Sequence, residues 1–321
     1  MMTVGQYSIF KHYIYDKHKF ILMGDYYQLP PFEPEQEDSL PSGVSLLKNP
    51  TKDLSMFFQF KCNDIKLFTN MRTQNKELND YISGIRSRVS GKEIQLTNNW
   101  KMDYDYIRMN KFREYIVICH KNKDVDKYNE NIRKELNIGK ELDEVEIGDK
   151  IVISQYYKCL TKDGLPYRLL NGDRGTISFY EPITLKFRAN ITRPDSEVID
   201  FNFYKIEVNN HFIIYKIKYD EYITFKKYIE KQVKLVMKKY PIVNVENIED
   251  NKNKRIELFR ELKSIRETHC FYNFGFASTV HKAQGSSYDV VMVLNDTNFY
   301  FRNKNKYTAV SRVVNELKIF S

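Results

Sequence analysis

A polar turn between two apolar segments constrains this chain more than any other feature. Residues 279–289 are Thr-Val-His-Lys-Ala-Gln-Gly-Ser-Ser-Tyr-Asp, and they follow an aromatic-rich segment at 271–276. Residues 290–294 are Val-Val-Met-Val-Leu, a run that predicts a buried strand. In a turn of this kind, backbone amides and short side chains can reach a ligand. The pattern therefore predicts a ligand-binding turn next to a buried strand.

A second polar turn follows another short apolar run. Residues 20–23 are Phe-Ile-Leu-Met, which predicts a buried parallel strand, and residues 24–31 are Gly-Asp-Tyr-Tyr-Gln-Leu-Pro-Pro. Asp25 and Gln28 are thus expected at the carboxyl end of the strand, the edge at which open α/β sheets bind ligands. The two prolines can continue neither a helix nor a central strand, so they stiffen the exit.

Two further segments complete a set in chain order. Residues 307–312 are Tyr-Thr-Ala-Val-Ser-Arg, which predicts a short helix carrying one arginine, and the apolar residues 317–320 predict a terminal strand. Residues 67–73 are Leu-Phe-Thr-Asn-Met-Arg-Thr. These segments resemble the motifs of superfamily I helicases, most of all the 5′-to-3′ branch with RecD and the Pif-type DNA helicases. In that family 24–31 correspond to motif III, 67–73 to motif IV, 279–285 to motif V and 307–312 to motif VI.

Two elements of that family are missing from the sequence. ATP hydrolysis by these enzymes uses a phosphate loop, Gly-x-x-x-x-Gly-Lys-Ser/Thr, and an Asp-Glu pair that holds magnesium. No Gly-Lys-Ser or Gly-Lys-Thr occurs, and the Gly-Lys-Glu sequences at 91–93 and 139–141 do not follow glycine-rich loops. We therefore expect the carboxyl-terminal part of a larger helicase, with an amino-terminal ATP-binding part encoded in the same frame or separately.

The resemblance implies an α/β architecture of the RecA-like P-loop NTPase fold. Residues 1–60 are expected to finish the first RecA-like domain, and 61–140 with 270–321 to form the second. Residues 141–269 are expected to be an insertion that holds a small SH3-like β-barrel and a helical region. The charge of the 222–266 segment is interpreted either as a solvated helical face or as a contact with DNA.

Local patterns predict individual elements. The expected helices are 75–89, 122–136, 227–239 and 251–268. The expected strands are 115–119, 151–153, 201–208 and 212–219. Asn171-Gly172 is a strong signal for a β-hairpin, because type I′ turns need positive φ at both central residues.

The resemblance assigns ATP chemistry to a small set of residues. Hydrolysis requires that charge on the γ-phosphate be neutralised and that the attacking water be held in line. The expected catalytic residues are Gln28, as a sensor, and Arg72 and Arg312, as charge stabilisers. The alternatives are a turn glutamine that binds backbone groups and arginines in surface ion pairs. The expected ATP-binding residues are Gly24, Asp25, Gln28, Arg72, Gln284, Gly285 and Arg312.

The DNA-facing part of the motif at 279–285 is expected to be Thr279, His281 and Lys282. A hydroxyl, an imidazole and an ammonium suit phosphate or sugar contacts, although a lone histidine is more often structural. Neither His281 nor His269 has a partner at metal-ligand spacing, so no metal site is expected. ATP and Mg²⁺ are the implied cofactors, with the magnesium ligands in the missing amino-terminal part.

Composition limits the possible compartments and partners. The formal net charge is +9, which permits binding to phosphate backbones. No apolar run approaches the length of a membrane span, and no signal peptide is visible, so an intracellular protein is expected in the cytoplasm, nucleus or a viral factory. The four cysteines lie far apart, as expected for reduced core residues. Richness in Lys, Asn, Tyr and Ile suggests an AT-rich genome such as that of a large DNA virus.

The predicted function is that of an ATP-dependent DNA helicase, with little or no ATPase activity in this chain alone. Its expected partners are single-stranded or forked DNA and a separate amino-terminal ATP-binding half, in replication or repair. The alternative is a non-catalytic nucleic-acid-binding or regulatory module derived from a helicase. An RNA helicase of the same superfamily also stays open, because contacts to the 2′-hydroxyl cannot be identified from sequence.

Overall fold

A computed structural model describes residues 25, 27–29, 70–89, 96, 100–111, 113–136, 145–242, 247–295 and 302–321. The chain divides into two compact units, residues 1–125 with 278–321, and residues 126–277. The strand expected at 20–23, the two prolines at 30–31 and residues 67–69 of the 67–73 segment lie outside the described residues. The expected boundaries of the two RecA-like domains and their insertion stay predictions.

The first unit is built on a four-stranded sheet. In sheet order its strands are β11 (Val313–Phe320), β10 (Tyr288–Leu294), β1 (Tyr115–Cys119) and β9 (Ala277–Thr279). β10 pairs in parallel with both β1 and β11. All five residues of β1 are buried, as its uninterrupted apolar sequence predicts for a parallel strand covered on both faces. The strands expected at 115–119, 290–294 and 317–320 are confirmed.

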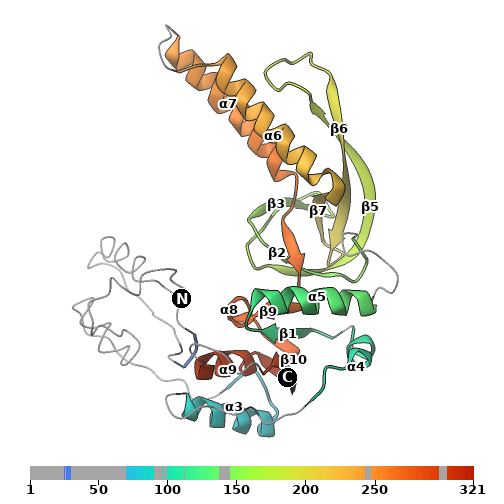
Figure 1. The fold of residues 1–321 in the computed structure, drawn as a ribbon, viewed down its shortest axis with the longest axis vertical. Coiled ribbons are helices and arrows are strands. Elements are labelled where there is room, and N and C mark those ends of the chain that lie inside the picture. Colours follow the sequence, from blue (N-terminus) through green and yellow to red (C-terminus); the bar gives the residue numbers. More distant parts are fainter. Residues whose placement is uncertain are drawn as a thin grey trace, which may run out of the picture. The chain divides into compact units, whose positions relative to one another are not determined.

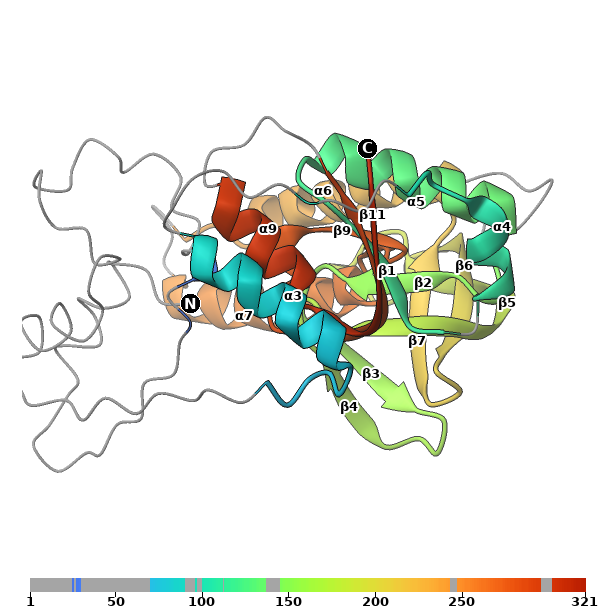
Figure 2. The same ribbon diagram turned by 90° about the horizontal axis from the view of Figure 1, so that it is seen from below.

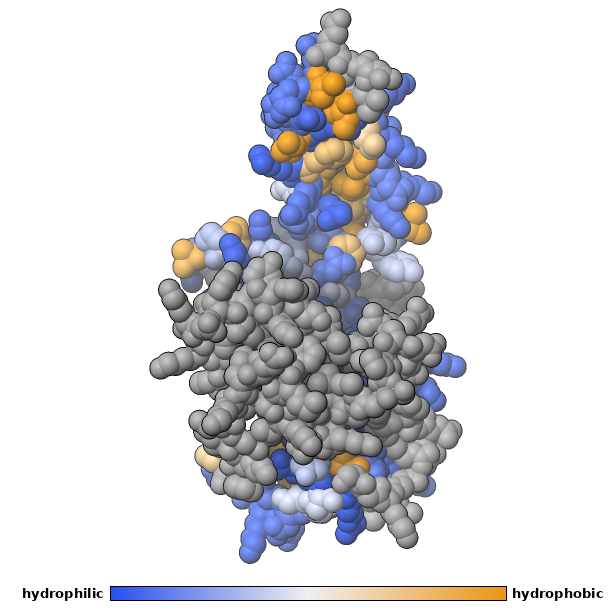
Figure 3. Space-filling view, turned by 90° about the vertical axis from the view of Figure 1, so that its left-hand side faces the viewer, coloured by the Kyte–Doolittle hydropathy of each residue, from blue (hydrophilic) through white to orange (hydrophobic). Residues whose placement is uncertain are grey.

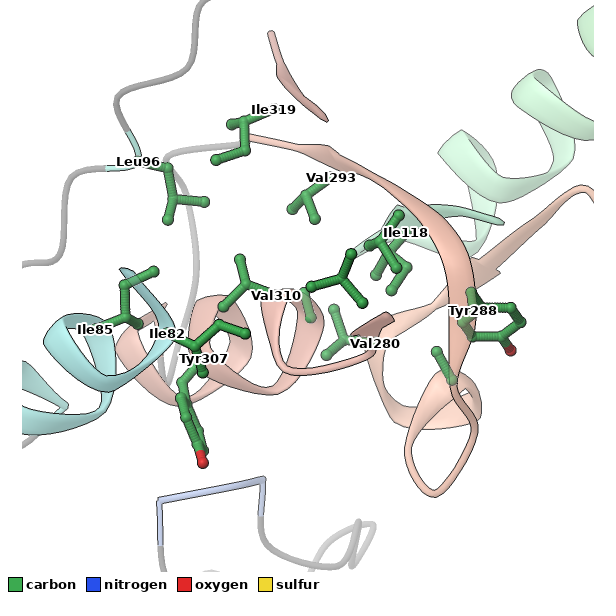
Figure 4. Packing of buried hydrophobic residues seen from close by; sticks show 14 of the residues in the cluster. Ile82, Ile85, Leu96, Ile118, Val280, Tyr288, Val293, Tyr307, Val310 and Ile319 are labelled. Carbon is green, nitrogen blue, oxygen red and sulfur yellow. The ribbon is translucent and has the colours of Figure 1, made fainter. Parts of the chain in front are cut away.

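Helices pack on this sheet. They are α3 (Lys76–Arg88), α4 (Tyr104–Met109), α8 (Val280–Ala283) and α9 (Arg302–Val310). The side chain of Asn75 accepts a hydrogen bond from the backbone N–H of Leu78 at 3.2 Å and so caps α3. Figures 1 and 2 show α3 beside α9. Figure 4 shows the resulting core, in which Ile82 of α3 and Val310 of α9 lie with side chains from β1, β10 and β11.

The second unit contains a seven-stranded sheet that curls strongly (Figure 1). Its order is β4 (Pro166–Leu169), β3 (Tyr157–Thr161), β7 (Phe212–Ile217), β6 (Val198–Val208), β5 (Arg174–Arg188), β2 (Lys150–Ile153) and β8 (Tyr272–Phe274). Every pairing in it is antiparallel. An inserted antiparallel sheet was expected here, and the more specific SH3-like barrel stays a prediction.

The hairpin expected at Asn171-Gly172 is wrong. Gly172 has φ +96°, so the turn exists, but the flanking strands do not pair with each other. β4 pairs with β3, while β5 pairs with β2 and β6. A tight hairpin instead joins β6 to β7 through Asn209 and Asn210, whose φ values of 55° and 54° fit the left-handed region that a type I′ turn requires. Local turn chemistry thus located the turn at Asn171-Gly172 but not the strand partners.

The rest of the second unit is helical. α5 (Asn122–Leu136) begins and ends as predicted. α6 (Tyr219–Lys239) and α7 (Ile248–Glu267) form an antiparallel hairpin, each starting earlier than expected. Buried Val236 of α6 and Leu262 of α7 share a core with Ile191. In the upper part of Figure 3, hydrophilic residues (blue) flank a hydrophobic strip (orange) on this part of the molecule.

Two further findings concern the whole described chain. Cys119, Cys159 and Cys270 are free and buried, as expected of reduced core residues, and Cys62 lies outside the described residues. Among the helices in the described ranges, none combines the length and the apolar character that crossing a bilayer requires.

Candidate functional site

The turn at Asp25 is organised by its own carboxylate. The backbone N–H of Tyr27 donates to Asp25 Oδ1 at 3.1 Å, and Gln28 Nε2 donates to Asp25 Oδ2 at 3.2 Å. The backbone N–H of Gln28 also reaches the carbonyl of Asp25 at 3.1 Å. A short aspartate side chain that binds the backbone two residues on is a common way to fix a turn. Gly24 lies outside the described residues.

This turn is held against α9. Tyr307 Oη donates to Asp25 Oδ2 at 2.8 Å, and the backbone N–H of Leu29 donates to Thr308 Oγ1 at 3.1 Å. Burial and the Asp25 carboxylate raise the pKa of Tyr307 well above its usual value, so the phenol keeps its proton and acts as a donor. Arg86 of α3 adds an ion pair to Asp25 Oδ1 at 3.6 Å. None of these three partners was predicted: Tyr307 and Thr308 lay within a motif, whereas nothing in the sequence marked Arg86.

Two predicted site residues that are 256 positions apart meet directly. Gln284 Nε2 donates to Gln28 Oε1 at 3.1 Å. Gln28 therefore bridges Asp25 and Gln284 through its two amide atoms. Gln284 follows α8 immediately and precedes Gly285, which has φ +91°. The two polar turns picked out in the sequence thus form one site.

Gly285→Ala is expected to lower the free energy of unfolding by about 1 kcal/mol, because an L side chain is strained at positive φ even where space is open. Gly285→Asn should cost less, since asparagine tolerates the left-handed region. Gly84 is the control: it lies inside α3, and no atom lies within 4 Å of the position that an added Cβ would take. Gly84→Ala should raise stability by about 0.5–1 kcal/mol. Urea unfolding measures the stability of all three variants. A Gly285→Ala variant as stable as the parent would contradict the positive φ of residue 285.

The two predicted arginines also lie together. Arg72 Nε donates to Ser287 Oγ at 2.7 Å, and Arg72 Nη1 donates to the carbonyl of Ser311 at 2.5 Å, one residue before Arg312. Arg312 Nε donates to the carbonyl of Thr308 at 3.1 Å, and its Nη2 donates to Ser311 Oγ at 2.8 Å. Arg312 follows α9 rather than lying on it, so the helix expected to carry the arginine ends two residues earlier.

The electrostatics of this pair are unusual for a protein interior. Arg312 is 1% exposed, yet no carboxylate in the described parts of the chain forms an ion pair with it or with Arg72. Burial, and after it the positive charge of Arg72, lower the pKa of Arg312 to about 10. Buried charges are ordinarily paired, because removing an ion from water is costly. The Asp25 carboxylate partly offsets the lowering of the Arg312 pKa, but it forms no ion pair with either arginine within the described residues.

The residues expected to face DNA divide into two kinds. Thr279 is buried at 7% exposure, and its hydroxyl accepts the backbone N–H of Lys282 at 3.4 Å, so it caps α8. Its hydroxyl therefore has a structural role that the motif did not reveal, and its expected contact with DNA stays a prediction. His281 and Lys282 are exposed on α8. Desolvation by neighbouring atoms lowers the pKa of His281, which leaves the imidazole neutral at pH 7.

No group of three His, Cys, Asp or Glu side chains that could hold a metal ion occurs within the described ranges. His269, the other histidine considered, is buried, and its Nδ1 accepts the backbone N–H of Ile217 at 3.3 Å. Burial lowers its pKa to about 3, so this imidazole is a neutral structural acceptor.

Homologues of the Pif type, within superfamily I of the helicases, cover almost the whole chain. One of these relatives is the ATP-dependent DNA helicase Pif1 of Campylobacter jejuni, which is 25% identical over 309 residues. The match covers 94% of this chain and 63% of the relative, so the chain spans less than two thirds of that protein's length. No protein-family model matches the sequence.

Two solved structures are similar at a lower level. Pif1 helicase from Bacteroides, in complex with ADP-AlF3 and single-stranded DNA, is 15% identical with a TM-score of 0.40, over 93% of this chain and 61% of that one. Pif1 helicase from Candida albicans is 12% identical with a TM-score of 0.43, over 93% and 62%. Both TM-scores are below 0.5, so the relationship rests on the sequence match.

Proposed function

We propose that this chain is the carboxyl-terminal part of an ATP-dependent DNA helicase. The intact enzyme couples ATP hydrolysis to 5′-to-3′ movement along single-stranded DNA and to duplex unwinding. The observation that carries the proposal is the Arg72–Arg312 pair, two guanidinium groups that lack a described carboxylate partner. The relative from Campylobacter jejuni, whose name states ATP-dependent DNA helicase activity, supports the same function.

The arginine pair suits the polyphosphate of ATP. A guanidinium is permanently charged and binds phosphate oxygens through two parallel hydrogen bonds. Arg312 Nη1 donates to no described residue, and this leaves one arm of the guanidinium for a ligand. Arg72 reaches the same place from the segment before α3. Together they neutralise charge on the γ-phosphate, where charge neutralisation lowers the barrier to hydrolysis.

Gln28 provides the sensor. Its amide oxygen accepts from Gln284 and its amide nitrogen donates to Asp25, so both ends are held in place. In the working enzyme one of these bonds is exchanged for the attacking water or a phosphate oxygen. Asp25, itself fixed by Tyr307 and Arg86, sets the orientation of the amide. Gly24 and Gly285 let the backbone approach the nucleotide.

The proposal also assigns the domains, the nucleotide-binding part and the DNA contacts of the intact enzyme. Residues 1–60 end the first RecA-like domain, 61–140 with 270–321 form the second, and 141–269 carry an SH3-like barrel. The phosphate loop and the Mg²⁺ ligands belong to an amino-terminal part, on the same polypeptide or a separate one. Thr279, His281 and Lys282 contact the phosphates of single-stranded or forked DNA, and the Thr279 hydroxyl also caps the start of α8. The enzyme acts inside the cell, in replication or repair.

The test compares the chain with and without an ATP-binding part. We expect the purified chain alone to show no DNA-stimulated ATP hydrolysis, because the phosphate loop supplies most contacts to the nucleotide. The DNA upstream of the Met1 codon should encode an Asp-Glu pair near the codon and a Gly-Lys-Ser/Thr loop further away. The joined protein should hydrolyse ATP in the presence of single-stranded DNA.

Two outcomes contradict the proposal. Turnover by the chain alone at the rate of a complete helicase would refute the assignment of the phosphate loop to another part. A stop codon close upstream, together with no ATP-binding partner and no turnover, would instead favour a non-catalytic nucleic-acid-binding module. Parallel assays with single-stranded RNA separate a DNA helicase from an RNA helicase.

A further inference from the structure

One face of α6 carries a regular row of lysines. Lys227, Lys231, Lys234 and Lys238 are spaced at i, i+4, i+7 and i+11, and all four are exposed. This spacing places them on one face of an α-helix with 3.6 residues per turn. At a rise of about 1.5 Å per residue the row is ~16 Å long. We refer to these four residues as the α6 lysine row.

The row differs from the lysines of the neighbouring helix. On α7, Lys252, Lys254 and Lys263 each form an ion pair with a glutamate of the same helix, at 3.5, 3.1 and 3.7 Å respectively. Within the described residues, no member of the α6 row forms an ion pair, and Glu230, exposed on an adjacent face of α6, forms none either. Like charges at i,i+4 weaken a helix by a few tenths of a kcal/mol. Lysines that served only solubility would gain no stability from being placed at i,i+4 without a carboxylate partner.

The row stands on a firmly anchored helix. Gln232, fully buried on the opposite face of α6, accepts the backbone N–H of Ile191 at 2.9 Å and donates to the carbonyl of Ala189 at 3.0 Å. Arg255 of α7 donates to the carbonyl of Tyr240 at 2.5 Å and so closes the carboxyl end of α6. The lysine positions are therefore set by the protein before any ligand arrives, which reduces the entropy cost of binding.

We propose that the α6 lysine row binds the phosphate backbone of duplex DNA. A straight row of ammonium groups matches a regular array of charges, and ~16 Å corresponds to about five base-pair steps of 3.4 Å along the axis of a duplex. Single-stranded sites combine basic grooves with stacking aromatic side chains. The exposed residues that flank the row, Ile223, Thr224, Glu230 and Met237, carry no aromatic ring, and the exposed ring of Tyr219 lies about two turns before Lys227, at the start of α6. Phosphate contacts of this kind carry no sequence information.

This site would bind the duplex part of a forked DNA. Its choice of DNA as the ligand rests on the proposed function. It needs neither ATP nor the arginine pair. The test therefore uses the full chain without nucleotide. Binding to a blunt duplex of about 20 base pairs is followed by fluorescence anisotropy over a range of salt concentrations.

The decisive variant is Lys227→Gln with Lys231→Gln and Lys234→Gln. Each lost phosphate contact reduces the slope of log K against log salt by about 0.9, so the slope should fall by about 3 and duplex affinity at least about tenfold. The matched control is Lys252→Gln with Lys254→Gln and Lys263→Gln, which removes the same charge from α7. It should change the slope by less than about 1. Circular dichroism checks that both variants keep their helices.

Several results would overturn the inference. One is equal loss of duplex binding in the two triple variants, which would indicate net charge alone. Another is a loss of single-stranded DNA binding as large as the loss of duplex binding. A third is no duplex binding by the unmodified chain. ATP hydrolysis by the joined protein is scored separately, so failure of this site and failure of the helicase assignment can be distinguished.

Discussion

Arg312→Met is expected to abolish most ATP turnover while making the chain more stable. In the protein that includes the ATP-binding part, turnover should fall at least about 10³-fold, the range found when an arginine is removed from a phosphoryl-transfer site. Binding to single-stranded DNA should be unchanged, because Arg312 is buried, whereas His281 and Lys282 are exposed. Steady-state ATP hydrolysis and anisotropy with a labelled single strand measure the two effects.

The gain in stability follows from the electrostatics. The pKa of Arg312 is lowered from its usual value to about 10, first by burial and then by Arg72, so the folded state disfavours the charged form. Below pH 10 this cost is fully present, and it is relieved only as the pH rises through the folded pKa. Methionine removes the cost but also the bonds to Thr308 and Ser311. We expect a net gain of about 1 kcal/mol in the free energy of unfolding of the chain.

Arg312→Lys is the control that separates charge from geometry. Lysine keeps the positive charge but lacks the planar fork, so turnover should still fall about 10²-fold and the gain in stability should be absent. Arg72→Met should lower turnover with a smaller change in stability, because Arg72 is only half-buried. The assignment fails if Arg312→Met retains turnover within about threefold of the parent. It also fails if the variant is destabilised by more than about 2 kcal/mol, as expected if Arg312 only stabilises the fold through its hydrogen bonds.

The elements that the sequence predicted well are those with a strong local period. β1 and α5 have the expected bounds because an uninterrupted apolar run and an amphipathic pattern leave few alternatives. The same local signals could not select partners. Asn171-Gly172 marks a turn, but the strands beside it pair elsewhere, because pairing in the curled sheet is decided by burial of whole strands.

The candidate site shows the same division. The motifs located Gln28 and Gln284, but the hydrogen bond between them depends on the packing of turns 256 positions apart. Arg86 lies in an ordinary helix, and only the fold brings it to Asp25. Thr279 has a residue type that suits phosphate contact, yet the start of α8 uses its hydroxyl. Motifs thus identify which residues are special, whereas their partners are properties of the tertiary structure.

Breaking the ion pair between Arg133 and Asp149 is expected to destabilise the second unit strongly. Arg133 of α5 and Asp149 are 2% and 0% exposed, and Arg133 Nε donates to both carboxylate oxygens at 3.0 and 3.1 Å. The Arg133 guanidinium also lies 4.5 Å from the ring centroid of Phe274. Asp149→Ala leaves a buried cation without its carboxylate, so the free energy of unfolding should fall by about 3–5 kcal/mol. Urea unfolding measures the loss.

The same pair should be replaceable as a unit. Burial raises the pKa of Asp149 to about 6 in spite of Arg133, so holding the ionised carboxyl in the folded state costs free energy. This cost is absent below pH 3.8, grows as the pH rises from 3.8 to about 6, and is fully present above that. Arg133→Met with Asp149→Leu removes both charges and should recover most of the loss, giving a coupling energy of at least about 2 kcal/mol.

An exposed ion pair supplies the comparison for that cycle. Lys254 and Glu257 lie 3.1 Å apart on α7, with side chains 58% and 69% exposed. Glu257→Ala should change the free energy of unfolding by less than about 0.5 kcal/mol, because solvent screens the pair. If Asp149→Ala costs as little as this, or if the double replacement at 133 and 149 is no better than the single one, the pair does not hold α5 to the turn before β2. The three variants thus distinguish a buried ion pair whose two charges depend on each other from one that contributes only packing volume.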